Sequence, residues 1–289
     1  LGSNYKPFLY ASALEAGLTA SSLINDAPIV FEDEALEDKW RPRNASGRFY
    51  GPTRLREALL QSVNLVSIRL LREIGIERVR DYSQNFGFQL EELNSDLSLA
   101  LGTASLSPIK NVAAYSVFAN GGKSVEPYFI SKITDRTGNT IFQKEDIEIN
   151  QAIDPRIAFI IKDILQEAAS RGTAKKVKEL GRGDLAGKTG TTNEAESTWF
   201  TGFNESLVTT VWVGFDQPKS LGNREFGSST ALPIWMDFMQ PNIDNLPKNK
   251  NLPPEGIVSI KIDKKTGLKA ESDSRNSIFE YYLEEHLPR

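Results

Sequence analysis

Hydrophobic positions near the start of the chain recur at the spacing of one helix face. These positions are Phe8, Leu9, Ala13 and Leu14. Gly17 follows them as a helix stop signal. Pro7 has to lie in the first turn, where its missing N–H costs little. The pattern therefore predicts a helix with Ser3 at its N-terminus.

Helical signals continue through the first part of the chain and again after residue 153. The expected order is a loop-rich stretch at 38–52, a helix pair within 53–75 broken near Ser62–Asn64, the segment 77–88, a helix from Ser107-Pro108 to Asn120–Gly122, and a helix over 154–170. Asp154 is the expected N-cap of the last helix, with Pro155 at its first position.

Alternating and β-branched segments predict strands in the second half. They are a hairpin within 124–144 that turns at Asp135–Gly138, and three closely spaced strands around 185–192, 197–203 and 207–215. A closing helix is expected at 230–239. A Pro/Asn-rich linker, a short alternating segment at 257–270 and a charged tail follow. The chain is predicted to be a helical half followed by an antiparallel sheet that helices cover.

The composition limits which catalytic groups and metal sites this chain can contain. The 289 residues suit one large domain or two small ones, and a net charge of -4 gives no general case for nucleic-acid binding. With no cysteine, a thiol nucleophile, a disulfide and a thiolate metal site are excluded. The single histidine, His286, is expected in a solvated tail, and one histidine cannot form a multi-histidine zinc site. A serine nucleophile here needs an activating group other than histidine.

The segment "LGRGDLAGKTGTTN" contains Gly-Lys-Thr and invites comparison with a phosphate-binding loop. That loop needs a glycine separated by four intervening residues from its Gly-Lys-Ser/Thr, and Arg182 occupies the position. The residues that follow predict a strand, whereas a phosphate-binding loop opens a helix. The phosphate-loop interpretation is rejected.

A buried lysine can activate a serine, because burial or a neighbouring cation lowers its pKa. Ser3 and Lys6 are three residues apart, which places them on one face of a helix. They form an S-x-x-K motif, which in one group of enzymes precedes an S-x-N and a K-T-G motif. Ser62–Asn64 and Lys188–Gly190 supply these in the required order.

Each motif alone is weak, since all three recur in this chain. The other copies are Ser107–Lys110, Ser83–Asn85, Ser274–Asn276 and Lys265–Gly267. Context separates them, because Ser107 has an expected role as an N-cap and Lys265–Gly267 lies in an expected turn. The two other S-x-N copies have no suitably placed K-T-G partner.

Six segments together carry a resemblance to a known family. They are "GSNYKPFLYASALEAG", "LREALLQSVNLVSIRLL", "SLALGTASLSP", "AYSVFANGG", "GKTGTTNEAESTWFTGF" and "VWVGFD". In this order they resemble the transpeptidase domain of class A penicillin-binding proteins. The likeness runs from Leu1 to about Met239, and "KTGTTN" followed by the aromatic "WFTGF" distinguishes this group from a bare K-T-G.

The resemblance implies an α+β, penicillin-recognising (β-lactamase/transpeptidase-like) fold, with an antiparallel sheet flanked by helices and an all-helical subdomain. It implies a transpeptidase domain at 1–240 and a linker with a C-terminal extension at 241–289. The strands that usually precede the S-x-x-K helix are missing, so the sheet is expected to be incomplete. A glycosyltransferase domain and a membrane anchor are expected upstream.

The resemblance also implies a role for each motif residue. Ser3 is the expected nucleophile, Lys6 its general base, Ser62 the relay to the leaving amine, and Lys188 a member of the same network. Asn64 is expected to hold a substrate amide, while Thr189, Gly190 and Thr191 bind the substrate along an edge strand. The N–H groups of Ser3 and Thr191 are the expected oxyanion donors. Apart from the resemblance, Trp199 and Phe200 are expected in the core or in the wall of the cleft, with the core favoured.

The implied activity is D,D-transpeptidation of peptidoglycan stem peptides, inhibited covalently by β-lactams. The implied location is extracytoplasmic, at the periplasmic face of the bacterial inner membrane. No cofactor, metal or nucleic-acid partner is expected. A β-lactamase needs a base for the deacylating water, and no candidate glutamate loop is evident. A D,D-carboxypeptidase and a penicillin-sensing domain remain open alternatives.

Overall fold

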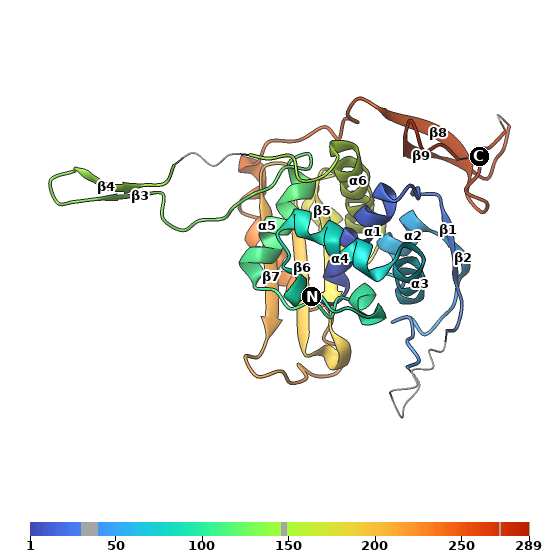
Figure 1. The fold of residues 1–289 in the computed structure, drawn as a ribbon, viewed down its shortest axis with the longest axis horizontal. Helices are drawn as coiled ribbons and strands as arrows, with labels where there is room; N and C mark the ends of the chain where they lie inside the picture. The colour runs from blue at the N-terminus through green and yellow to red at the C-terminus, as the bar shows by residue number, and fades with distance from the viewer. Residues whose placement is uncertain (30–39, 146–148, 272, 289) are drawn as a thin grey trace.

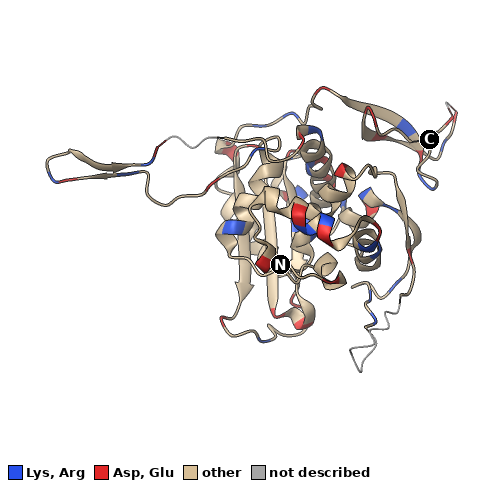
Figure 2. Cartoon of the chain, in the orientation of Figure 1, with Lys and Arg blue, Asp and Glu red and all other residues tan. Residues whose placement is uncertain are grey.

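The computed structural model describes residues 1–29, 40–145, 149–271 and 273–288. Helices cover a central antiparallel sheet, the β3–β4 hairpin projects from one side, and the β8–β9 hairpin lies beside α6 (Figure 1). Acidic and basic residues are interspersed along the helices (Figure 2). The α+β arrangement predicted from the sequence is confirmed. Residues 38 and 39 of the predicted loop-rich stretch lie outside the described residues.

Most helices begin where the sequence signals predict. The α-helices are α1 (Lys6–Glu15), α2 (Leu55–Leu60), α3 (Asn64–Ile74), α4 (Ile76–Ser83), α5 (Pro108–Ala119), α6 (Pro155–Arg171) and α7 (Ala231–Met239). Short 3-10 turns are η1 (Gly2–Tyr5), η2 (Gln84–Phe86), η3 (Leu90–Glu92), η4 (Leu97–Leu101), η5 (Lys175–Leu180), η6 (Asn193–Ala195) and η7 (Ile243–Asn245). Asp154 caps α6 through its side chain, as predicted. Ser107 occupies the N-cap position of α5, but its side chain makes no capping hydrogen bond, which corrects part of its predicted role.

The main sheet has the order β5-β6-β7 and consists of β5 (Ala186–Thr191), β6 (Ser197–Phe203) and β7 (Val208–Gly214). Each neighbouring pair is antiparallel, and Lys188 lies opposite Thr201. Within this sheet β5 is therefore an edge strand, as predicted. The predicted hairpin forms from β3 (Lys132–Thr134) and β4 (Thr140–Gln143).

The sheet lies between two apolar clusters. Trp199 packs in the cluster that contains α1, whereas Phe200 packs in the cluster of α7, where its ring meets Trp235 at a centroid distance of 5.1 Å. Successive residues of a strand point to opposite faces, so β6 contributes to both clusters. Both side chains are buried, which confirms their predicted place in the core. Helix α1 is buried from Lys6 to Leu14, as a helix surrounded by other elements requires.

Two strand pairs were not predicted. β1 (Leu23–Asp26) pairs with β2 (Gly51–Arg54), although both contain residues that are typical of turns. β8 (Ile257–Asp263) lies in the predicted alternating segment, but its partner β9 (Ser277–Leu283) lies in the predicted charged tail. The tail prediction was wrong for β9.

Among the described residues, no helix has the length and apolar character that crossing a membrane requires.

Candidate active site

Ser3 lies in the 3-10 turn η1, which leads into α1, and not at the N-terminus of the α-helix itself. Residues three apart eclipse one another in a 3-10 turn, so the S-x-x-K spacing keeps its meaning. The turn packs directly on β5. A Cβ on Gly2 (φ +55°) would lie 2.4 Å from Thr191 O, and one on Gly190 would lie 2.5 Å from Leu1 O. Two glycines thus allow the half-buried Ser3 to sit beside the K-T-G strand.

Lys6 is fully buried, as the apolar residues after it predict. Its Nζ donates to Ser62 O at 2.8 Å and to Asn64 Oδ1 at 2.7 Å, with a longer contact of 3.4 Å to Ser62 Oγ. Burial, and then the charge of Lys188, hold the pKa of the Lys6 amine well below its ordinary value. Within the described residues, no hydrogen bond joins Lys6 to the Ser3 hydroxyl.

Ser62 occupies the break between α2 and α3 that the sequence predicts. Its φ is +58°, a left-handed conformation that costs a non-glycine residue about 1–3 kcal/mol. The turn is held by hydrogen bonds from its N–H to Leu59 O at 3.1 Å and from Val63 N–H to Ala58 O at 2.8 Å. This strained turn aims Ser62 Oγ between the two lysines, with Lys188 Nζ at 2.9 Å.

Lys188 is also fully buried, and its Nζ donates to Thr189 O at 3.0 Å besides Ser62 Oγ. Burial lowers the pKa of this amine to about 7. Within the described residues, neither lysine makes an ion pair with a carboxylate. A pair of buried amines without counter-charges can hold one proton or none near neutral pH, and this is the electrostatic basis of the site.

The side chain of Asn64 makes hydrogen bonds to other parts of the protein. Its Oδ1 accepts from Lys6, and its Nδ2 donates to Arg43 O at 2.9 Å. Its backbone N–H donates to Asn44 Oδ1 at 2.9 Å. Contact with a substrate amide stays a prediction, and the visible function of Asn64 is to orient Lys6.

The threonines of β5 differ in how their hydroxyls are used. Thr189 Oγ1 donates to Thr173 Oγ1 at 2.9 Å, whereas Thr191 Oγ1 accepts the N–H of Gly227 at 3.0 Å. The Thr191 hydroxyl hydrogen therefore remains available for an anionic ligand. Gly190 allows a close backbone approach by Leu1, the residue just before η1. Its contact with a substrate stays a prediction.

Sequence reasoning missed two polar residues of the site, Asn4 and Thr173. Asn4 is fully buried and donates to Lys188 O at 2.8 Å, which fastens η1 to β5. Its Oδ1 accepts from Thr201 and Asn111, each at 3.0 Å. A polar residue next to an otherwise buried run was the available signal for Asn4. Thr173 follows a helix-ending glycine directly, and its sequence context gave no signal of a role in the site.

The decoy motifs lie elsewhere. Gly267 of the second K-T-G has φ +69° in a turn that Asp263 caps, as predicted. Lys110 pairs with Glu92. The expectation of a solvated His286 was wrong, because the side chain is half-buried and a Cβ on Gly17 would lie 3.7 Å from its Nε2. Gly17 follows α1 at the end opposite Lys6, and a helix of this length spans about 15 Å, so His286 is not beside Ser3.

Residues 1–240 match the family model described as penicillin-binding protein transpeptidase domain. Penicillin-binding protein 1A of Pseudomonas aeruginosa is 43% identical over 336 residues, covering 99% of this chain and 41% of that protein. Penicillin-binding protein 1A of Neisseria gonorrhoeae is 45% identical over 263 residues, covering 89% of this chain and 33% of that protein. The chain thus spans less than half the length of these relatives.

Solved structures show the same relationship. The crystal structure of penicillin-binding protein 1A from Haemophilus influenzae has a TM-score of 0.94 at 35% identity, covering 100% of this chain and 48% of that chain. The structure of PonA1 from Mycobacterium tuberculosis in complex with penicillin V has a TM-score of 0.73 at 24% identity, covering 86% of this chain and 70% of that chain. The second likeness concerns the fold.

Proposed function

The chain belongs to the family of penicillin-binding protein transpeptidase domains, and on that premise we propose that it is a serine D,D-transpeptidase that cross-links peptidoglycan stem peptides. The penicillin-recognising fold expected from the sequence is confirmed by the structural relatives. The catalytic roles, the substrate and an extracytoplasmic location are parts of the proposal.

In the proposed reaction, Ser3 Oγ attacks the carbonyl between the two terminal D-alanines, and Lys6 Nζ takes the hydroxyl proton. The two short contacts of Lys6 account for both N–H groups of a neutral amine, which leaves its lone pair for that proton. The proton passes through Ser62 to the departing D-alanine amine. An amine of a neighbouring stem peptide then attacks the ester, and its proton returns to Ser3 through Lys6.

Two further features support the substrate side of the proposal. The backbone of Gly2 lies so close to Thr191 that a Cβ there would be 2.9 Å from Thr191 N, which suits the N–H groups of Ser3 and Thr191 as oxyanion donors. Lys188 and the Thr191 hydroxyl suit a terminal carboxylate, and the edge of β5 suits an extended peptide.

The observation that carries the proposal is the convergence of Lys6, Ser62 and Lys188 from three distant segments. The buried amine of Lys6 lies 3.4 Å from Ser62 Oγ, and that of Lys188 lies 2.9 Å from it. Among the described residues, neither amine has a counter-charge. A purely structural site has no reason to bury two uncompensated amines, which is costly. An acyl-transfer site requires an amine that is neutral near pH 7.

The test is covalent labelling with a fluorescent penicillin, followed by peptide mass mapping. We expect one adduct, on Ser3, and no labelling of Ser3→Ala. An adduct on Ser107, or undiminished labelling of Ser3→Ala, would contradict the proposal. Transfer of a thioester-activated D-alanyl donor to an amine would separate an enzyme from a sensor. Rapid steady-state hydrolysis of a chromogenic cephalosporin would favour the β-lactamase alternative.

A further inference from the structure

The segment after residue 240 ends in the β8–β9 hairpin, which is docked on the rest of the chain. The ring of Tyr281 on β9 meets Phe159 on α6 edge-on, with centroids 5.1 Å apart. Leu283, also on β9, is 5% exposed and belongs to the same apolar cluster as α1. This packing fixes β9 against the helices that support the candidate active site.

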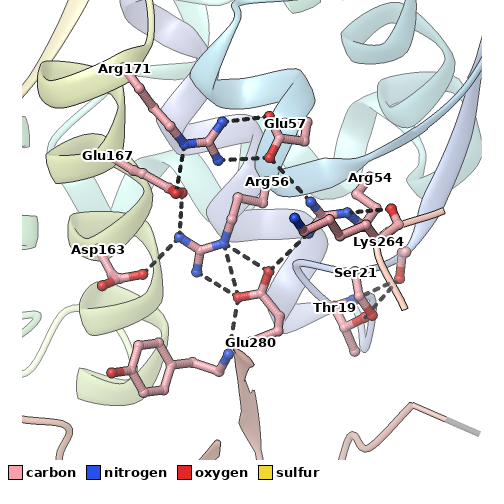
Figure 3. A network of polar contacts seen from close by, with 12 residues as sticks. Thr19, Ser21, Arg54, Arg56, Glu57, Asp163, Glu167, Arg171, Lys264 and Glu280 are labelled. Carbon is pink, nitrogen blue, oxygen red and sulfur yellow. Dashed lines mark hydrogen bonds and ion pairs between the residues drawn. The ribbon is translucent and has the colours of Figure 1, made fainter. Parts of the chain in front are cut away.

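The hairpin inserts one carboxylate into this interface. Glu280 on β9 is 1% exposed. Arg56 on α2 donates to it through Nε, at 2.8 and 3.0 Å, and through Nη2 at 2.6 Å (Figure 3). Arg54 adds a longer contact of 3.5 Å from Nη1. A buried bidentate pair of this kind holds both side chains in one geometry.

Arg56 carries the contact onward from the hairpin to α6. Its Nη1 lies 2.8 Å from Asp163 Oδ2 and 3.1 Å from Glu167 Oε2 (Figure 3). One turn further along α6, Arg171 donates two hydrogen bonds of 2.7 and 3.0 Å to Glu57, the residue after Arg56 on α2. The arginines and carboxylates therefore clamp α2 and α6 together, and Glu280 is the member that the C-terminal hairpin supplies.

The two clamped helices end at the active site. Helix α2 ends at Leu60, just before Ser62, and α6 ends at Arg171, just before Gly172 and Thr173. These ends touch, because Thr173 N–H donates to Leu60 O at 3.4 Å and a Cβ on Gly172 would lie 2.6 Å from the same oxygen. Just past this contact, Ser62 accepts hydrogen bonds from Lys6 and Lys188. Thr173 Oγ1 accepts the hydrogen bond of the Thr189 hydroxyl.

We propose that Glu280 is a positioning residue for the transpeptidase site, acting through Arg56 on the turn of Ser62 and on Thr173. The inference rests on the proposed function. A left-handed serine persists only where its surroundings over-determine its conformation. Removing the Glu280 charge releases Arg56 toward Asp163 and Glu167, loosens the end of α2 and lets Ser62 leave its place between the lysines.

The test compares Glu280→Gln with Glu285→Gln in the whole chain. Glu285 lies in the turn just after β9. It pairs at 2.8 Å with Arg156, at the start of α6 and far from Thr173. We expect Glu280→Gln to slow the acylation rate constant with a fluorescent penicillin about two- to thirtyfold, the range typical of such couplings. Glu285→Gln should retain the wild-type rate constant.

The readout separates positioning from stability. Partial unfolding lowers the amplitude of labelling, whereas misplacement of Ser62 lowers the rate constant of the molecules that remain folded. The effects of Glu280→Gln and Arg56→Gln on the rate constant should not add, because both break one pathway. If Glu280→Gln does not fold, Glu280→Asp, which retains the charge on a shorter side chain, gives the same comparison with a smaller loss.

Wild-type rate constants in folded Glu280→Gln or Glu280→Asp would overturn the inference. Equal slowing by Glu285→Gln would overturn it too, since any loosening of the hairpin would then suffice. Failure of the proposed function has its own signature, because wild-type Ser3 would then not be labelled at all.

Discussion

Among the described residues of this protein, cationic side chains are buried with counter-charges in one region and without them in another. In the clamp between α2, α6 and β9, Arg56 meets three carboxylates within 3.1 Å. In the active site, Lys6 and Lys188 meet only hydroxyl, carbonyl and amide oxygens. The arginine is compensated and stays charged, whereas the pKa of each lysine is lowered.

Burial has opposite consequences for a cation with a counter-charge and for one without. A compensated cation fixes neighbouring elements in place, because breaking the pair leaves a charge stranded. An uncompensated amine loses its proton near neutral pH and becomes a base, at a cost in stability. The two clusters meet where α2 ends, which is the basis of the proposal that the charged clamp supports the turn of Ser62.

Lys6→Ala should produce the largest effect on function. Without a neighbouring base, acylation of Ser3 should fall about 10²–10⁴-fold, the usual contribution of general-base catalysis. The matched control is Lys162→Ala, because Lys162 is nearly as buried but pairs with Glu205 at 2.6 Å. Stopped-flow labelling with a fluorescent penicillin measures both. Comparable losses in the two variants would remove the distinction between compensated and uncompensated lysines.

Arg56→Met tests the compensated side of the comparison. It leaves Glu280 in the interior with only the longer, 3.5 Å contact of Arg54, so the free energy of unfolding should fall by about 3–5 kcal/mol. Arg78→Met is the control, since Arg78 and Glu15 form an exposed pair 3.4 Å apart and its loss should cost less than about 1 kcal/mol. Urea titrations of both variants give the comparison. Similar small losses would mean that the clamp does not stabilise the fold.

Thr191→Ala should have a smaller effect on acylation. The substitution spares the proposed backbone oxyanion donor and removes the proposed hydroxyl contact to the substrate carboxylate, together with the hydrogen bond from Gly227 N–H. Such a contact is worth about 1.5–3 kcal/mol, or about ten- to a hundredfold in rate. A β-lactam with an esterified carboxylate should be affected less. Equal losses for acid and ester would show that Thr191 does not bind the carboxylate.

A further prediction is a slope in stability with pH. Lys188 has a folded pKa of about 7, below its ordinary 10.5, and Lys6 is lowered as well. Between the folded and unfolded pKa values the unfolded chain binds more protons, so stability rises with pH by about 1.4 kcal/mol per unit for each such lysine. Lys6→Met should flatten the rise between pH 7 and 10. An unchanged slope would show that Lys6 titrates normally.

Local signals predicted much of the fold. Asp154-Pro155 marked the start of α6, and β-branched runs marked β5, β6 and β7. β9 was missed because "SIFEYYL" contains Glu280 and runs into further charges, which is typical of a solvated tail. Its true environment depends on Arg56, which is 224 positions away in the chain. No local pattern contains such a partner.

In the candidate site too, some residues were predicted from local signals and others were missed. Residue type and order predicted the cluster of Lys6, Ser62 and Lys188, because lysine-activated serines need those groups. The contact partners of Asn4 and Thr173 could not be predicted, since they depend on how η1 and the end of α6 lie against β5. The left-handed turn at Ser62 was likewise invisible, because the sequence predicted a helix break but not its handedness.

Buried, uncompensated lysines are proposed to supply a neutral amine for Ser3 near neutral pH. The most direct test is the acylation rate constant of the wild-type protein from pH 6 to 10, measured with a β-lactam that does not ionise in this range. The coupled pair predicts a plateau above about pH 8 and a decline below about pH 7, as the amines take up a proton. A rate constant that rises tenfold per unit up to pH 10 would indicate a lysine with an ordinary pKa and would contradict the claim.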